Sequence, residues 1–199
     1  MTKIFITGGI SSGKSSFAEE TAISLYKSPI AAGGRQDVTE ESGGQLHFIA
    51  TARQRKYEDE ELALKIKKHK DKRDKAFIVH EDFNDLSAEI DGIRKFLSSE
   101  PVPGRGVILI DSMTLWLSSI FKDVSGYDSA LESVIKFSEY LSKVECSVVT
   151  VADSLGFNIV AADAYVRKFI ELNGLMEQEL SALSDKAYCV IAGNPVALK

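Results

Sequence analysis

Residues 3–15 read KIFITGGISSGKS, and Gly8 to Ser15 match the complete phosphate-binding loop pattern G-x-x-x-x-G-K-[ST]. A short apolar run precedes the loop, and residues 14–26 have the composition of a helix. The motif requires this strand–loop–helix setting, because backbone N–H groups must converge on phosphate oxygens at the start of a helix. The stretch therefore predicts an α/β fold that binds a nucleoside triphosphate.

The residue types in the loop suit phosphate chemistry. Glycine permits backbone angles that bring successive N–H groups together around an anion. Lys14 would place a cation against the outer phosphates, and Ser15 would offer its hydroxyl to Mg²⁺. We expect the nucleotide to contact the whole loop, which consists of Gly8, Gly9, Ile10, Ser11, Ser12, Gly13, Lys14 and Ser15.

Apolar strands and helices alternate along the rest of the chain. Strands are predicted at 3–7, 46–50, 76–79, 107–111, 147–151 and 188–192, and helices near 14–26, 58–73, 84–98, 114–122, 128–143 and 161–183. Continuous apolar strands separated by helices indicate a mainly parallel sheet covered on both faces. The pattern predicts a three-layer α/β fold. We expect residues 1–199 to form one nucleotide-binding domain, with 27–45 as a surface loop.

Composition narrows the class of protein. The net charge of −5 and pI near 5.3 argue against a nucleic-acid partner, because nucleic-acid-binding domains are usually basic. No apolar run approaches membrane-spanning length, which predicts that the chain has no membrane span. Cys146 and Cys189 have no metal-ligand spacing and are expected to be buried and reduced. A cytoplasmic protein is predicted.

Asp111 ends the apolar run Val107-Ile108-Leu109-Ile110. In phosphate-loop proteins, a carboxylate at the end of such a strand supports the magnesium ion. Asp also often caps the helix that follows a strand, so the residue has a purely structural interpretation as well. Together with the loop, the pattern favours Asp111 as a catalytic residue and a metal ligand.

A strongly basic segment surrounds His69. Residues 65–75 contain seven basic and two acidic side chains. On the predicted helix 58–73, His69 shares one face with Leu62, Ile66 and Arg73, so it would face the body of the protein. The segment is either a solvated helix end, matched to the helix dipole, or a cationic site with a nucleophilic imidazole. His47 and His80 fall in predicted strands and are interpreted as structural.

Segments along nearly the whole chain resemble the bifunctional adenosylcobinamide kinase/adenosylcobinamide-phosphate guanylyltransferase family of cobalamin biosynthesis. The matching residues are Thr7-Gly8-Gly9, Ser12-Gly13-Lys14-Ser15, Phe48-Ile49-Ala50-Thr51-Ala52, Asp59-Glu60-Glu61-Leu62, Lys65-Ile66, His69, Arg73, Asp111, Thr114-Leu115-Trp116-Leu117, Val190-Ile191-Ala192-Gly193-Asn194-Pro195 and Leu198-Lys199. The order of these segments is more specific than the phosphate loop alone.

The resemblance implies a RecA-like phosphate-loop fold, a homotrimer and two reactions. One transfers a phosphoryl group from a nucleoside triphosphate to adenosylcobinamide. The other transfers GMP from GTP to adenosylcobinamide phosphate through a guanylyl-histidine intermediate, with His69 as the nucleophile. Mg²⁺ would be the cofactor, and ATP and GTP the nucleotide substrates. Outside the loop, the implied nucleotide contacts are Thr51, Ala52, Arg53, Lys70, Asp71, Lys72, Arg73, Glu81 and Asp111.

The chain also differs from the common family pattern, at Ser11, Ser154, Leu175 and Glu177 among other positions. Two alternatives therefore stay open. One is another small-molecule phosphate-loop kinase that lacks nucleotidyl transfer, and the other is a non-catalytic nucleotide-binding relative. The loop contacts phosphates and not bases, so the sequence leaves ATP and GTP equally open as the phosphoryl donor.

Overall fold

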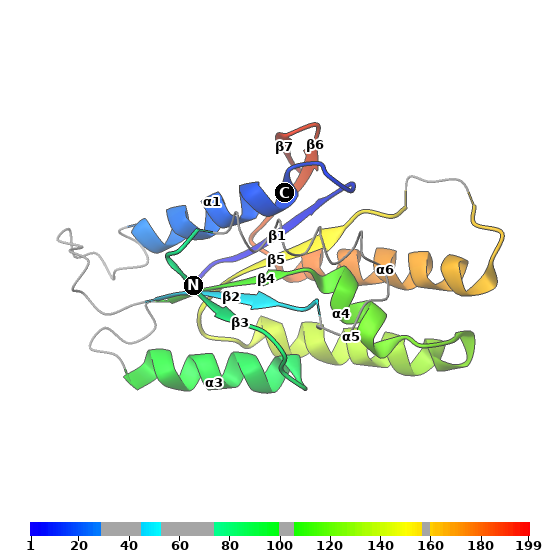
Figure 1. Ribbon diagram of the computed structural model, residues 1–199, viewed down its shortest axis with the longest axis horizontal. Coiled ribbons are helices and arrows are strands. Elements are labelled where there is room, and N and C mark those ends of the chain that lie inside the picture. Colours follow the sequence, from blue (N-terminus) through cyan, green and yellow to red (C-terminus); the bar gives the residue numbers. More distant parts are fainter. Residues whose placement is uncertain (29–44, 53–73, 100–105, 157–159) are drawn as a thin grey trace.

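The computed structural model describes residues 1–28, 45–52, 74–99, 106–156 and 160–199 (Figure 1). Seven strands form one sheet in the order β3-β2-β4-β5-β1-β6-β7. Their bounds are β1 Lys3–Gly8, β2 Gln45–Ala50, β3 Phe77–His80, β4 Gly106–Asp111, β5 Ser147–Asp153, β6 Lys186–Ile191 and β7 Asn194–Ala197. Every neighbouring pair is parallel except β6 and β7, which form an antiparallel hairpin.

Helices cover both faces of this sheet (Figure 1). The described helices are α1 Lys14–Lys27, α3 Leu86–Ser99, α4 Met113–Ile120, the short 3₁₀ helix η1 Val124–Gly126, α5 Tyr127–Ser142 and α6 Ala164–Leu183. Helix α1 packs against β1, β2, β4 and β5, and α3, α4, α5 and α6 contribute to the core on the opposite face. The arrangement is the three-layer α/β fold that the sequence predicts.

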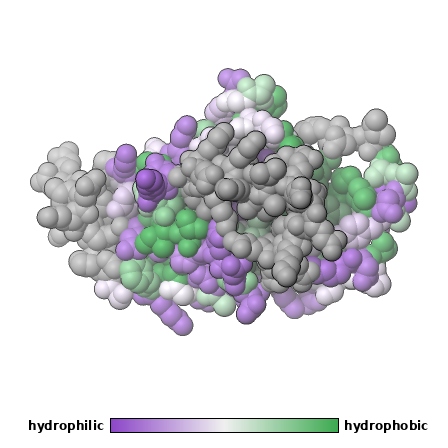
Figure 2. Space-filling view, in the orientation of Figure 1, coloured by the Kyte–Doolittle hydropathy of each residue, from purple (hydrophilic) through white to green (hydrophobic). Residues whose placement is uncertain are grey.

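Alternation along the strands produces two cores. Toward α1 the sheet buries Ile4, Ile6, Leu46, Phe48, Val107 and Leu109, and toward the other helices it buries Phe5, Ile49, Ile108, Ile110 and Val148. The central strands are apolar on both sides because both sides are covered, which is typical of parallel sheets. Hydrophilic side chains line the lower edge of Figure 2, over α3 and α5, as expected for the outer faces of amphipathic helices.

The predicted strands and most of the predicted helices agree with the structure to within about three residues. The helix predicted at 58–73 and most of the loop predicted at 27–45 lie outside the described residues. Strand β7 was not predicted. The expectation that both cysteines are buried was wrong for one of them, since Cys146 is buried and Cys189 only half-buried; both are free thiols.

Candidate functional site

The phosphate loop connects β1 to α1 and is shaped by two of its glycines. A Cβ on Gly8 would lie 2.6 Å from the Val190 carbonyl oxygen, so only glycine fits against β6. Gly13 has φ 93° directly before α1, in the region that favours glycine. The loop thus delivers Lys14 to the first position of the helix, where free N–H groups and the helix dipole favour an anion.

The β6–β7 hairpin supports the loop from the side. The Gly193 N–H donates to the Ser12 carbonyl oxygen at 2.9 Å, and a Cβ on Gly13 would lie 3.4 Å from the Gly193 Cα. Gly193 itself has φ 81°, which suits the tight turn between the two strands. The Ala-Gly-x-Pro segment near the C-terminus therefore acts on the phosphate loop by packing beside it.

Lys14 is buried and forms an ion pair with Asp153, the last residue of β5. Its Nζ lies 2.6 Å from Asp153 Oδ1 and 3.3 Å from the Gly9 carbonyl oxygen. Asp153 is level with Gly8 in the register of β5 and β1, so its carboxylate stands beside the phosphate loop. The cation predicted to meet the outer phosphates is thus held at the end of the neighbouring strand.

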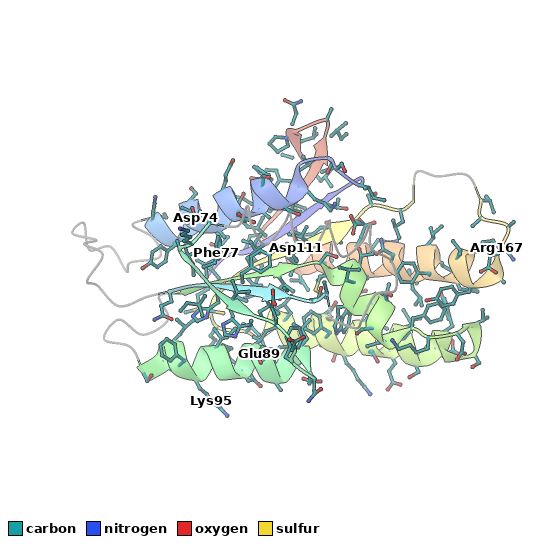
Figure 3. All side chains as sticks on the ribbon, in the orientation of Figure 1. Asp74, Phe77, Glu89, Lys95, Asp111 and Arg167 are labelled. Carbon is teal, nitrogen blue, oxygen red and sulfur yellow. The ribbon has the colours of Figure 1, made fainter. Side chains whose placement is uncertain are left out.

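Asp111 ends β4, on the far side of β5 from the loop (labelled in Figure 3). The residue that caps α4 is Ser112, whose Oγ accepts a hydrogen bond from the Leu115 N–H at 3.3 Å. Helix capping therefore does not explain the carboxylate at position 111. Its oxygens and the Ser15 hydroxyl belong to the same edge of the sheet, and both are ligand types that Mg²⁺ accepts.

Three more of the predicted nucleotide contacts follow neighbouring strands at this edge. Thr51 and Ala52 come directly after β2, and Glu81 comes directly after β3. The Thr51 N–H donates to the Asp111 carbonyl oxygen at 3.2 Å, and its hydroxyl donates to the Ser112 carbonyl oxygen at 2.5 Å. The remaining predicted site residues lie outside the described residues: Arg53, His69, Lys70, Asp71, Lys72 and Arg73.

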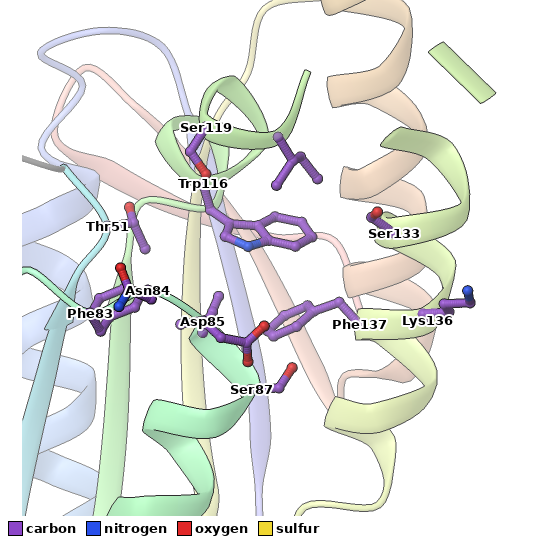
Figure 4. Close-up of a pocket in the computed structure, with 12 residues that line it drawn as sticks. Thr51, Phe83, Asn84, Asp85, Ser87, Trp116, Ser119, Ser133, Lys136 and Phe137 are labelled. Atoms are coloured by element: carbon purple, nitrogen blue, oxygen red, sulfur yellow. The ribbon is translucent and has the colours of Figure 1, made fainter. Parts of the chain in front are cut away.

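A cavity of about 280 Å³ opens beside Thr51 (Figure 4). Aromatic rings of Phe83, Trp116 and Phe137 form part of its wall, and the Trp116 and Phe137 ring centroids are 4.9 Å apart. The other lining residues are Asn84, Asp85, Leu86, Ser87, Ser119, Ile120, Ser133 and Lys136. The volume is close to the lower limit of small-molecule sites, about 300 Å³.

Residues outside the predicted site support it from α4, α6 and β1. Asn173 is completely buried and bonds to Thr114 and to the Asp153 backbone. The Thr7 hydroxyl donates to the Glu177 carboxylate. Burial raises the pKa of Glu177 above its ordinary value, and the nearby Asp153 carboxylate raises it further, while the bond from Thr7 opposes the shift.

Of the residues around Lys14, Asp153 stands at a recognisable position in the sequence. Asp153 ends the apolar run of β5 just as Asp111 ends that of β4. What the sequence did not provide is the strand order, which inserts β5 between β1 and β4 and places Asp153 nearer to the loop. Asn173 and Glu177 fall within an ordinary amphipathic helix, where no spacing sets them apart.

The two remaining histidines form a separate cluster. His47 Nδ1 lies 3.0 Å from His80 Nε2, and His80 Nδ1 lies 2.6 Å from Glu89 Oε1. Burial lowers the pKa of His47 to about 4, and the nearby His80 adds to that shift. His47 is therefore neutral at physiological pH.

Comparison with known proteins identifies the family. Residues 4–198 match the family described as cobinamide kinase / cobinamide phosphate guanyltransferase. The chain belongs to this family. As a family member it is an enzyme, with kinase and guanylyltransferase chemistry.

Two relatives match over almost their full length. The bifunctional adenosylcobalamin biosynthesis protein CobP of Pseudomonas aeruginosa is 26% identical over 196 residues, with 98% of this chain and 95% of the relative covered. The bifunctional adenosylcobalamin biosynthesis protein CobU of Salmonella typhimurium is 25% identical over 207 residues, covering 98% and 99%.

Among solved structures, an ATPase domain is similar with a TM-score of 0.53 and 12% identity, covering 94% of this chain and 68% of that one. This likeness confirms the RecA-like phosphate-loop fold. Among the helices that the structure describes in this chain, none is long and apolar enough to cross a membrane.

Proposed function

We propose that this enzyme phosphorylates adenosylcobinamide with a nucleoside triphosphate and then transfers GMP from GTP to the product through a guanylyl-histidine intermediate at His69. Both reactions would use the edge of the sheet where β1, β5, β4 and β2 end. The observation that carries the proposal is the convergence of Lys14, Asp153 and Asp111 at that edge in a chain that belongs to this family.

The kinase half rests on the phosphate loop. The loop N–H groups and Lys14 would bind the β- and γ-phosphates, with Ser15 and Asp111 holding Mg²⁺ directly or through water. The ion would neutralise negative charge on the phosphates. A hydroxyl oxygen of the corrinoid would attack the γ-phosphorus, and the bond to the bridging oxygen would break to release the nucleoside diphosphate. The hydroxyl proton would leave to solvent or a nearby carboxylate.

The guanylyltransferase half rests on the resemblance and on imidazole chemistry. A neutral imidazole nitrogen of His69 would attack the α-phosphorus of GTP and displace pyrophosphate, forming a phosphoramidate. A phosphate oxygen of the phosphorylated corrinoid would then attack the same phosphorus and free the histidine. Lys70, Lys72 and Arg73 follow His69 in the sequence and would balance phosphate charge.

Within the part of the chain that the structure describes, the cavity beside Thr51 is the most suitable place for the guanine of GTP. Its aromatic wall offers surface for stacking a planar base, and the amide, carboxylate and hydroxyl groups around it can pair with base edges. Thr51 connects the cavity to the carboxyl edge of the sheet, where the phosphates would lie. ATP or GTP could serve as phosphoryl donor, and a homotrimer is the expected assembly in solution.

The kinase half is tested by offering adenosylcobinamide with γ-labelled ATP or γ-labelled GTP and Mg²⁺. We expect label to appear in a corrinoid that gains one phosphate, and no label when Lys14→Ala replaces the parent protein. Release of labelled phosphate without a labelled corrinoid, from either nucleotide, would contradict the assignment of the acceptor.

A further inference from the structure

We propose that Asp153 is the counter-ion that Lys14 must exchange for the triphosphate, and that Thr114 and Asn173 are positioning residues that hold Asp153 in place. The consequence is selectivity for the magnesium complex of the nucleotide over the free nucleotide. The inference rests on the nucleotide-binding part of the proposed function, and not on the identity of the acceptor.

A closed set of hydrogen bonds fixes the backbone of Asp153. Its N–H donates to Thr114 Oγ1 at 2.8 Å, and its carbonyl oxygen accepts from Asn173 Nδ2 at 2.8 Å. The Thr114 hydroxyl in turn donates to Asn173 Oδ1 at 2.9 Å. Helices α4 and α6 therefore hold both peptide groups of the last residue of β5.

The peptide group between Asp153 and Ser154 also ties this strand end to the phosphate loop. The Ser154 N–H donates to the Gly8 carbonyl oxygen at 3.0 Å. Asn173 is 0% exposed and Thr114 only 7%, so any polar group left without a partner there would be desolvated at a cost of about 1–3 kcal/mol. The backbone at position 153 is thus held rigidly, and the carboxylate has a fixed origin.

The carboxylate itself opposes the ligand. It holds Lys14 Nζ at 2.6 Å, with side-chain exposures of 10% and 23% for the lysine and the aspartate. The lysine must turn toward the outer phosphates for the motif to work. Asp153 therefore competes with the nucleotide for one cation and repels the phosphate charge, and Glu177 adds negative charge nearby when it is ionised.

This repulsion depends on the charge of the ligand. A free triphosphate is more negative than its magnesium complex, so the fixed carboxylate penalises the free form more strongly. A device of this kind keeps the loop available for the form of the nucleotide that can react. Because Asp153 acts from a clamped backbone, the penalty depends on Thr114 and Asn173 as well.

The test is titration calorimetry with ATP, either in EDTA or with excess Mg²⁺, on the full chain. For Asp153→Asn we expect affinity for free ATP to rise about tenfold, because the competing charged hydrogen bond is lost. Affinity for Mg·ATP should rise less, so the ratio of the Mg·ATP affinity to the free-ATP affinity should fall. Unchanged or weaker binding of free ATP would overturn the proposal.

The positioning role is tested with Thr114→Val, Asn173→Leu and the conservative Thr114→Ser. Thr114→Val and Asn173→Leu should each lower the ratio of the Mg·ATP affinity to the free-ATP affinity, by less than Asp153→Asn does. Added to Asp153→Asn, neither substitution should change this ratio further. Thr114→Ser, which keeps the hydroxyl, should restore the parent ratio. Effects that add fully to Asp153→Asn would show that the pair does not act through Asp153.

A matched control is Thr150→Val. Thr150 is a buried threonine three residues earlier on β5, with its hydroxyl 3.4 Å from the Ile4 carbonyl oxygen. It should lower the free energy of unfolding without changing the affinity ratio, and an equal change in the ratio would contradict the positioning role. If a Thr114 or Asn173 variant does not fold, the Asp153→Asn titration alone decides. The titrations contain no corrinoid. Their outcome therefore tests the role of Asp153 even if the enzyme proves not to phosphorylate adenosylcobinamide.

Discussion

The carboxyl edge of the sheet carries two regions of different character within a few strands of each other. At β1 and β5 the phosphate-loop region is built from charge and backbone, with Lys14, Asp153 and a glycine-shaped turn. At β2 and β3 the cavity region is built from aromatic side chains and short polar groups, with Thr51 at its border. Each is thus suited to a different part of a nucleotide.

The difference separates two tasks. Phosphoryl chemistry needs charges at fixed positions, and the hydrogen bonds around Asp153 supply that rigidity. Recognition of a base or another ring needs a shaped surface, and the rings of Trp116 and Phe137 supply that surface. If the comparison holds, changes in the phosphate-loop region should affect both reactions, and changes in the cavity region should affect one more than the other.

The largest effect is expected from Lys14→Ala. Among the residues of the loop motif, none but Lys14 carries a cation, so phosphoryl transfer should fall by about a thousandfold. Guanylylation should fall as well, since both reactions bind a triphosphate. Steady-state assays of both activities measure this, with Lys27→Ala at the far end of α1 as the control. Near-parent kinase activity in Lys14→Ala would remove the phosphate loop from the mechanism.

Asp111→Asn should have the next largest effect. The amide cannot balance the charge of Mg²⁺, so turnover at limiting Mg²⁺ should fall by about a hundredfold, while binding of nucleotide without metal changes little. The measurement is turnover as a function of Mg²⁺ concentration. A magnesium dependence that matches the parent protein would exclude Asp111 as metal support.

Trp116→Ala tests the other region. Loss of a stacking surface costs about 1–3 kcal/mol per base, so the KM for GTP in guanylylation should rise about tenfold or more. The kinase kcat with ATP should stay within about twofold, because the phosphate-loop region is untouched. Trp116→Phe, which keeps an aromatic ring, is the matched variant. Equal losses in both reactions would show that the two regions do not divide the work as we infer.

The smallest effect is expected from Glu177→Gln, on stability. Because the folded pKa of this carboxyl is raised by burial, ionisation destabilises the folded state as pH rises through the folded pKa. Below the ordinary pKa the penalty is absent. The variant should therefore gain about 0.5 kcal/mol in free energy of unfolding at neutral pH and nothing at acidic pH. Denaturant unfolding at several pH values measures this, and an equal gain at all pH values would point to packing instead of charge.

Much of the fold followed from residue patterns. The strands β1, β2, β4 and β5 are mainly apolar on both of their faces, and only a sheet covered on both faces can bury such strands. Strand β7 could not be predicted from the sequence. All four of its residues are exposed and one of them is Pro195, so it has neither the apolar pattern nor the usual composition of a strand. Its pairing with β6 is set by the tight turn at Gly193.

Part of the candidate site could likewise be predicted from the sequence, and part of it could not. The loop residues are contiguous, so their chemistry could be recognised from one segment. Asp153 could not be assigned without the strand order, because its importance comes from lying between β1 and β4. The cavity is assembled from four separated segments around Thr51, Phe83, Trp116 and Phe137, and no spacing in the sequence brings these together.

A covalent guanylyl-histidine at His69 is tested most directly with α-labelled GTP and Mg²⁺. We expect the parent protein and His80→Gln to retain label that is stable in base and labile in acid, as for a phosphoramidate, and peptide mapping should place it at His69. His69→Ala should take up no label and should still phosphorylate adenosylcobinamide. Label on another residue, or label that persists in His69→Ala, would contradict the assignment and leave only the kinase reaction.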